Sequence, residues 1–226
     1  MITIQGLTMS YGNHTILKNI NLEFDEGKVY GIVGKNGAGK TSLFRCIAGL
    51  EKYDGIINSS LNPLKNHLGL LHAEPFFFEK ITGKEYIQLL CNARNKPTND
   101  IEGNNVFDLP LNQYATTYST GMKKKLALTA ILLQRNQYFI LDEPFNGVDI
   151  ESNILLTEII HTLKKLGKTV VMSSHIFSTL GDTCDEINLI NDGSIVKSIQ
   201  REDFQLLEKE MKEMTVGNRI EKLGLL

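Results

Sequence analysis

The residues with the clearest potential for chemistry are the glycines, lysine and threonine of the segment GKNGAGKT at residues 34–41. The segment fits the pattern G-x-x-x-x-G-K-[ST], in which backbone N–H groups cradle phosphate groups. Glycine leaves those amides uncovered at a helix N-terminus, where the helix dipole also favours anions. The residues expected to hold a nucleoside triphosphate are Gly34, Lys35, Asn36, Gly37, Ala38, Gly39, Lys40, Thr41 and Ser42.

Two residues of this loop have specific expected roles. Lys40 places a positive charge near the terminal phosphates, and Thr41 offers a hydroxyl to Mg²⁺. An apolar run at residues 29–33 precedes the loop and a helical pattern follows it, which is the strand-to-helix context that the motif requires. The alternative is a glycine-rich turn that ends in Lys-Thr by coincidence, and the flanking pattern makes it the weaker interpretation.

Two carboxylates form a second candidate for chemistry. Asp142 and Glu143 follow directly after the apolar run at residues 138–141. A buried carboxylate is costly unless a cation or hydrogen-bond donors compensate it, so the end of a buried strand is a place to expect a magnesium site. We expect Asp142 to hold Mg²⁺ and Glu143 to orient or deprotonate an attacking water. Taken alone, an Asp-Glu pair that simply begins a loop would be the better interpretation.

The pattern of the whole chain predicts an α/β fold that positions these groups. Residues 2–7 and 20–24 alternate apolar and polar side chains, which predicts half-buried strands of an antiparallel sheet before the phosphate loop. The wholly apolar runs at 138–141 and 170–172 are typical of inner strands of a parallel sheet. The strands expected at 186–190 and 195–198 are joined by a turn at Gly193. Strands that alternate with helices indicate a mainly parallel sheet.

The composition changes after Glu74. Thr82-Gly83-Lys84-Glu85 predicts a helix start, and a helical pattern returns at 120–135. We therefore expect one domain over residues 1–226, with a small helical subdomain at about 75–135 inserted in its core. A charged helical tail is expected at about 201–226.

Length and composition exclude several classes of protein. The chain has 226 residues, of which 42% are apolar, so it can bury the core of one large domain. A net charge of −2 argues against a domain whose main partner is nucleic acid. Cysteines 46, 91 and 184 lie far apart without C-x-x-C spacing, which indicates a reducing compartment. Neither a signal peptide nor a membrane-spanning run is apparent, so we predict a cytoplasmic chain.

Further motifs follow the phosphate loop in a fixed order. They are YSTGMKKK at 118–125, FILDEPFNGVD at 139–149 and SSH at 173–175. With the loop, this ordered set resembles the ATP-binding subunits of ABC transporters, over nearly the whole chain. The resemblance implies a P-loop NTPase core with an N-terminal antiparallel β subdomain and a small helical subdomain. The motif YSTGMKKK resembles most the corresponding motif of the exporter-type subunits.

The resemblance also assigns roles to single residues. It implies that Tyr11 stacks on adenine, that the γ-phosphate is contacted across a dimer interface by the segment Ser119, Thr120, Gly121 and Met122, and that the catalytic residues are Glu143, His175 and Lys40. The segment 146–149 resembles the loop that links the two sites of the dimer. Each assignment has a plain alternative, because many tyrosines lie in strands or turns and a histidine at a strand end is usually only a satisfied polar residue.

The function that the resemblance implies is ATP hydrolysis that powers transport through a separate transmembrane permease. The cofactors would be ATP and Mg²⁺, and a second ATPase subunit, identical or different, would complete the dimer. The chain would lie at the inner face of the cell membrane, held there by its partner. The alternatives are a soluble ATPase of the same superfamily that acts on ribosomes or DNA, and a regulatory module that binds ATP with little hydrolysis. A P-loop kinase is weaker still.

Three departures qualify the resemblance. Ala73 stands where the family usually has a glutamine that touches Mg²⁺, and Glu74 follows it. Thr120 replaces a more usual glycine, and the insertion after Glu74 is short. The lysine run at 123–125 is expected to form a solvated helix face, with binding of phosphate or anionic lipid as the alternative.

Overall fold

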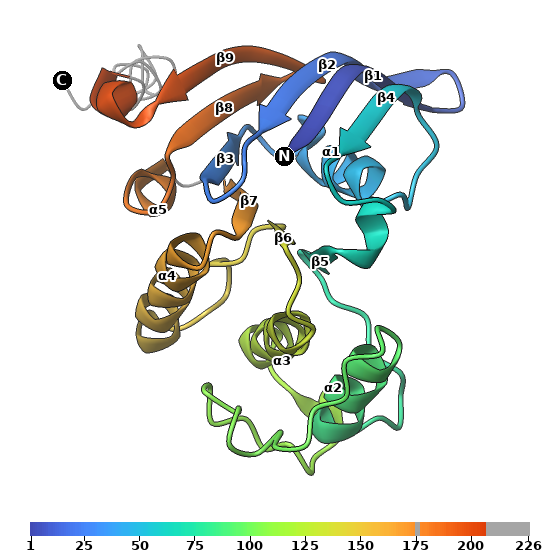
Figure 1. Ribbon diagram of the computed structural model, residues 1–226, viewed down its shortest axis with the longest axis vertical. Helices are drawn as coiled ribbons and strands as arrows, with labels where there is room; N and C mark the ends of the chain where they lie inside the picture. Colours follow the sequence, from blue (N-terminus) through green and yellow to red (C-terminus); the bar gives the residue numbers. More distant parts are fainter. Residues whose placement is uncertain (175–176, 207–226) are drawn as a thin grey trace, which may run out of the picture.

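A computed structural model describes residues 1–174 and 177–206 (Figure 1). Most of the tail expected at 201–226 lies outside the described residues. The strands are β1 Ile2–Tyr11, β2 His14–Phe24, β3 Val29–Val33, β4 Asp54–Ser59, β5 Leu68–Leu71, β6 Tyr138–Leu141, β7 Thr169–Ser174, β8 Glu186–Asn191 and β9 Ser194–Gln200. The helices are α1 Lys40–Ile47, α2 Gly83–Asn92, α3 Thr120–Leu133, α4 Ile150–Lys165 and α5 Phe177–Gly181, with short 3-10 helices at Leu64–Asn66, Ala115–Thr117 and Arg201–Asp203.

The larger sheet has six strands in the order β5-β6-β7-β3-β8-β9. All of its neighbours pair in parallel except β8 and β9, which are antiparallel. The predicted α/β class with a mainly parallel sheet is therefore confirmed. In such a sheet the carboxyl ends of β3, β6 and β7 lie at one edge, so loops that follow these strands meet there.

The smaller sheet has three strands in the order β2-β1-β4, all antiparallel. The strands expected at 2–7 and 20–24 are confirmed but too short, because the β1–β2 hairpin continues as far as Tyr11 and His14. In Figure 1 this sheet lies at the top, with α1 beneath it, while α3 and α2 lie at the bottom.

Two hydrophobic cores lie on opposite faces of the larger sheet, and the alternation of β6 shows how they are separated. Tyr138 and Ile140 belong to the core that includes α1 and the smaller sheet. Phe139 and Leu141 belong to the core that includes residues of α3 and α4. A strand that is buried on both faces reads as a continuous apolar run, which is why 138–141 was predictable.

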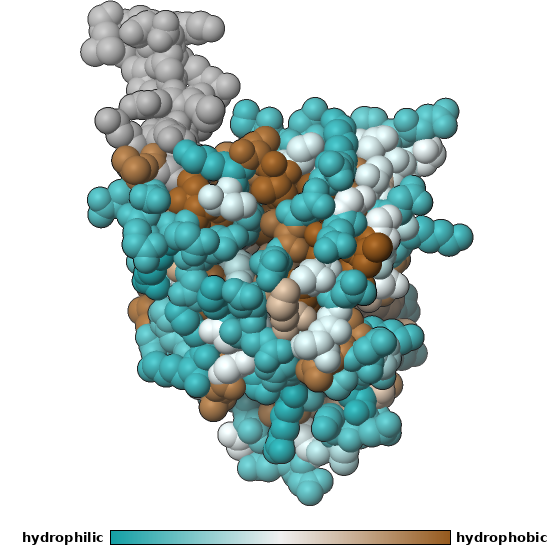
Figure 2. All heavy atoms as spheres, turned by 45° about the horizontal axis from the view of Figure 1, so that its top comes forward, coloured by the Kyte–Doolittle hydropathy of each residue, from teal (hydrophilic) through white to brown (hydrophobic). Residues whose placement is uncertain are grey.

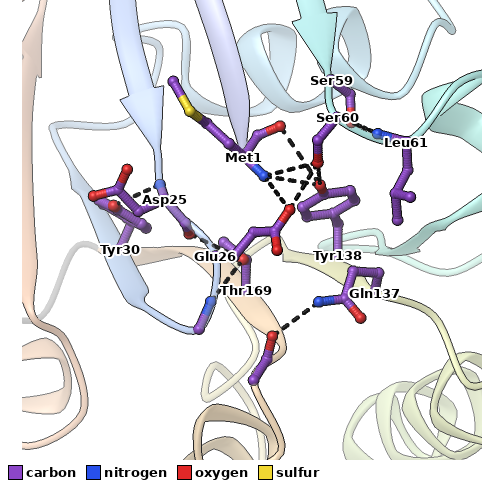
Figure 3. Close-up of polar contacts among 12 residues, drawn as sticks. Met1, Asp25, Glu26, Tyr30, Ser59, Ser60, Leu61, Gln137, Tyr138 and Thr169 are labelled. Carbon is purple, nitrogen blue, oxygen red and sulfur yellow. Dashed lines mark hydrogen bonds and ion pairs between the residues drawn. The ribbon is translucent and has the colours of Figure 1, made fainter.

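Polar contacts join the smaller sheet to the start of β6, as Figure 3 shows. The Tyr138 hydroxyl lies 2.9 Å from Ser60 Oγ and 3.0 Å from the Met1 amine. The same amine donates to Glu26 Oε1 at 2.8 Å. These contacts hold the amino end of β6, while its carboxyl end leads into the candidate site residues Asp142 and Glu143.

The helices begin at capping residues that the sequence places there. Thr82 and Glu85 form a capping box at the start of α2, since each side chain accepts a hydrogen bond from the other residue's backbone N–H. Ser119 caps α3 and Asp149 caps α4. The helix expected at Thr82 is thus confirmed, while the subdomain bounds of 75–135 stay a prediction.

Among the described strands and α-helices, β5 and α5 were not predicted. Each is only a few residues long and too short for periodicity to identify. Within the described ranges, no helix has both the length and the apolar character that crossing a bilayer would require. The face drawn in Figure 2 is mostly hydrophilic, with apolar residues gathered in its upper part.

Candidate active site

The glycine loop leads from the fully buried strand β3 into α1. Gly39 is the N-cap of α1 and has φ of 109°, a conformation that favours glycine. No side chain caps this helix end. The first N–H groups of a helix have no partner within the helix, so those of α1 are available to an anion.

Lys40 is buried inside the loop, with only 6% of its surface exposed. Its Nζ donates to the carbonyl oxygens of Gly34 at 2.7 Å and Lys35 at 3.3 Å. The same atom lies 3.5 Å from Glu143 Oε1. The ammonium therefore faces one of the two predicted carboxylates.

Asp142 is tied to two neighbouring segments. It is 2% exposed and lies at the carboxyl end of β6. Thr41 Oγ1 donates to Asp142 Oδ2 at 2.7 Å, and Ser173 Oγ donates to Asp142 Oδ1 at 2.6 Å. Ser173 also accepts from the N–H of Glu143 at 2.9 Å. The parallel pairing of β6 with β7 brings Ser173 to this place, because Leu141 lies beside Met172.

A cavity of about 480 Å³ connects these groups. Its walls combine the glycine loop, the two carboxylates and the loop after β5. The lining residues are Ile16, Asn36, Gly37, Gly39, Lys40, Thr41, Ser42, Ala73, Glu74, Asp142 and Glu143. The structure thus brings together a helix N-terminus, a buried ammonium and carboxylates in one hollow. Ala73, where the family resemblance expects glutamine, is part of the wall.

Thr41 and Asp142 form a donor set that fits Mg²⁺. Thr41 and Asp142 present hydroxyl and carboxylate oxygens, the ligand types that this hard cation prefers. Among the described residues, no group of three or more His, Cys, Asp or Glu side chains could hold a metal ion by itself. Mg²⁺ is usually bound by one or two carboxylates together with phosphate and water rather than by a cage of protein ligands.

The electrostatics around the cavity involve a second buried lysine. Burial lowers the pKa of Lys124, while the nearby Glu143, Asp142 and Glu74 act in the opposite direction. The pKa of His72 is also lowered, first by burial and then by Arg45. Acidic groups outnumber the bases that line the cavity, which favours an added cation.

The predicted signature residues lie apart from this cavity. Ser119 Oγ accepts from the N–H of Met122 at 3.2 Å, and Ser119 and Thr120 are exposed. Within the described part of the chain, none of residues 119–122 lines the cavity. Their predicted contact with a γ-phosphate stays a prediction, and it would require a different site from the one that contains Lys40.

Two further assignments stay predictions. Tyr11 is 50% exposed, does not line the described cavity, and donates through its hydroxyl to Glu51 Oε1 at 2.9 Å. His175 lies outside the described residues. The proposed stacking of adenine and the contact of the histidine with phosphate are therefore untested.

Sequence reasoning was wrong about Lys124 and did not single out Ser173. The run 123–125 was interpreted as a solvated face, but Lys124 is 3% exposed. A signal was present, because Lys124 lies one helical turn before the buried Leu128 and so shares its face. Ser173 is a polar residue next to the end of the inner strand β7, at the same edge of the sheet as Asp142 after β6.

Comparisons with known proteins identify relatives over most of the chain. Residues 17–146 match the family model described as ABC transporter. The lantibiotic transport ATP-binding protein SrtF of Streptococcus pyogenes is 31% identical over 222 residues, which cover 92% of this chain and 95% of the relative. The bacitracin transport ATP-binding protein BcrA of Enterococcus faecalis is 29% identical over 234 residues, 96% of this chain and 75% of the relative.

Solved structures share the fold. An ATP-binding subunit of an ABC transporter superposes with a TM-score of 0.81 at 24% identity, covering 95% of this chain and 99% of that one. A dimeric ATP-binding cassette, captured after hydrolysis with ADP and Pi, has a TM-score of 0.77 at 19% identity, covering 89% and 99%. The expected resemblance is thus confirmed, and at these identities the structures support the fold alone.

Proposed function

Because the chain belongs to the ABC transporter family, as one of its ATP-binding and ATP-hydrolysing subunits, we propose that its reaction takes place in the cavity between the glycine loop and β6. One observation carries this proposal. Lys40, Thr41 and Asp142 meet beside Glu143 in a single hollow, at the carboxyl edge of the sheet. This is where open α/β sheets bind their ligands.

Residues of this chain would divide the work of binding and hydrolysis. The amides at the start of α1 and the Lys40 ammonium hold the phosphates, as a charge-assisted set of donors. Glu143 accepts a proton from the attacking water or orients it. His175 is proposed to bond the γ-phosphate, and Tyr11 to stack on the adenine.

Mg²⁺ is proposed to bind through Thr41 and Asp142. Their oxygens lie 2.7 Å apart, which supports one shared position for a hard cation. When bound, Mg²⁺ neutralises negative charge on the phosphates. Asp142 keeps its place through the hydrogen bond from Ser173.

A second ATPase subunit is proposed to complete each site. Exposed Ser119 and Thr120 lie at the N-terminus of α3, apart from the chain's own cavity. A helix N-terminus offers amides to an anion, so residues 119–122 of one subunit would contact the nucleotide held by the other. The dimeric cassette with ADP and Pi is a protein of the same fold.

The partner in the membrane is proposed to be a separate permease, which would hold this chain at the inner face of the cell membrane. The relatives are ATP-binding proteins named for transport of lantibiotics and bacitracin, and this supports a substrate of that class. It also favours transport over action on ribosomes or DNA. The net charge of −2 is in keeping with a chain that has no nucleic-acid partner.

The test is the variant Glu143→Gln. It keeps the shape and polarity of the side chain but removes the base, so kcat should fall by roughly 10²–10⁴-fold while ATP binding is retained. Phosphate release measures turnover, and size-exclusion chromatography with ATP should detect an accumulated dimer. Glu158→Gln, on the exposed face of α4, is the matched control and should leave turnover unchanged. Unchanged hydrolysis in Glu143→Gln would remove this residue from its proposed role.

A further inference from the structure

Lys124 is a buried lysine that the proposed reaction does not use. It lies in the second turn of α3, is 3% exposed, and is not among the residues that line the cavity. Its Nζ donates to the carbonyl oxygen of Glu143 at 2.6 Å and to that of Asn146 at 2.8 Å. The ammonium therefore lies under the loop that carries the predicted catalytic carboxylate.

Burying an ammonium group is costly unless it is hydrogen-bonded. Here two backbone carbonyls receive charge-assisted hydrogen bonds, which are short and stronger than neutral ones. A solvated lysine would not need these partners. The two hydrogen bonds therefore compensate the buried charge of Lys124 and also restrain the backbone of the loop.

The loop has a conformation that depends on such contacts. Glu143 has φ of 49°, in the left-handed region that non-glycine residues seldom adopt. Both of its backbone polar groups are held by side chains, because its N–H donates to Ser173 Oγ and its carbonyl accepts from Lys124. With both groups held, the direction in which the Glu143 carboxylate leaves the loop is determined.

The same face of α3 holds the rest of this loop. A Cβ atom on Gly121 would lie 2.6 Å from the carbonyl oxygen of Gly147, so helix and loop are in close contact there. One turn further, Lys125 Nζ pairs with Asp149 Oδ2 at 3.0 Å. The start of α3 and residues 143–149 therefore form one connected unit.

We propose that Lys124 is a positioning residue, which sets the Glu143 carboxylate by holding the backbone of residues 143–146. Because Ser119 is the N-cap of α3, the contact also joins the exposed end of α3 to the base in the chain's own cavity. This inference rests on the proposed function for its catalytic part. The structural part, the fixing of the loop by the ammonium, stands independently of it.

The main experiment is Lys124→Met, which replaces the aliphatic stem of the lysine with a similar apolar chain and removes the ammonium group with its donors. A small displacement of a reacting group can cost about 100-fold in rate, so kcat should fall by about that factor while the Kd for ATP stays within about twofold. In the Glu143→Gln background, Lys124→Met should cause no further loss. Additive losses in the double variant, or a kcat like that of the unmodified protein, would overturn the proposal.

Lys123→Met is the matched control. It removes a lysine from the neighbouring position of the same helix, and within the described residues its ammonium has no hydrogen bond or ion pair. Its turnover should match that of the unmodified protein. If turnover fell equally in Lys124→Met and Lys123→Met, the cause would be the lost positive charge. That result would contradict the proposed role of Lys124.

Amide hydrogen exchange tests the structural part without ATP turnover. The Glu143 and Asn146 amides should exchange faster in Lys124→Met and at the normal rate in Lys123→Met. If the unmodified protein lacks ATPase activity, the proposed function fails, while this measurement still decides whether Lys124 fixes the loop. Unchanged exchange would overturn that part.

If Lys124→Met does not fold, a second variant, Lys124→Gln, tests the proposal. The side chain of Lys124→Gln is one atom shorter but keeps an uncharged N–H donor for the loop carbonyls, so this variant should fold and lose no more than about tenfold in kcat. A loss as deep as that predicted for methionine would contradict the account.

Discussion

The starts of α1 and α3 each place a buried lysine against two backbone carbonyls of a loop. Lys40 donates to Gly34 and Lys35, within its own loop. Lys124 donates to Glu143 and Asn146, in a loop that is distant in the sequence. Only Lys40 lines the cavity, where it also faces the Glu143 carboxylate.

The difference shows that the same local chemistry has different uses at different places in the fold. An ammonium at the wall of the cavity can transfer its hydrogen bonds to a phosphate. An ammonium behind the wall can only hold the backbone that forms it. We therefore expect substitution of Lys40 to weaken the binding of ATP. Substitutions at the start of α3 should instead lower the turnover of ATP.

The largest effect is expected for Lys40→Ala. Removal of a buried, hydrogen-bonded charge should raise the Kd for ATP by roughly 100-fold or more. Titration with a fluorescent ATP analogue measures this, with the exposed Lys52→Ala as control. Near-normal nucleotide affinity would contradict the phosphate-loop assignment and remove the contrast between the two lysines.

A smaller effect is expected for Gly121→Ala. The added Cβ would lie 2.6 Å from the Gly147 carbonyl, so helix and loop must separate. Such overpacking typically costs about 1–3 kcal/mol, which urea unfolding would detect together with reduced turnover. Gly181→Ala is the control, since no described atom lies within 4 Å of its added Cβ. If the two variants were equally stable, the close contact of α3 with the loop would be refuted.

The smallest effect concerns acid stability at Asp149. Hydrogen bonds from Ser152 and Lys125 hold the pKa of this carboxyl well below its ordinary value of 3.8. The folded carboxylate thus stays charged to lower pH than the unfolded one, so its stabilising contribution is present above about pH 4 and is lost as the pH falls further. Asp149→Asn should therefore make the free energy of unfolding less dependent on pH below 4.

Urea unfolding at several pH values would measure this effect, with Asp54→Asn as the control. Because Asp149 is exposed, salt should screen part of the effect. An unchanged pH dependence would show that the pairing of Lys125 with Asp149 contributes nothing to the junction of α3 and the loop.

Local patterns predicted much of the fold. The helix start at Thr82 and the inner strand at 138–141 are confirmed, because each depends on neighbouring residues alone. The lengths of β1 and β2 were underestimated, because irregular register interrupts their alternation. β5 was missed because its four residues include a glycine and show no period.

The candidate site was predicted in part. The glycine loop and the pair Asp142 and Glu143 do share one cavity, although their roles await experiment. Lys124 was misjudged because a run of like charges was considered without the buried face of its helix. Glu74 and Ala73 were noted from the sequence, but nothing in their spacing indicated that they would line the same wall as Lys40.

The sequence alone determined the phosphate-loop motif, the strand with its terminal carboxylates and the helix starts, since backbone hydrogen bonding and periodicity are properties of adjacent residues. The tertiary structure decided which of these meet. Only the strand order β5-β6-β7-β3 brings Ala73, Asp142, Ser173 and the glycine loop to one edge. The packing of α3 against residues 143–149 decided which carbonyls Lys124 meets on the buried face of its helix, because these partners are distant in the sequence.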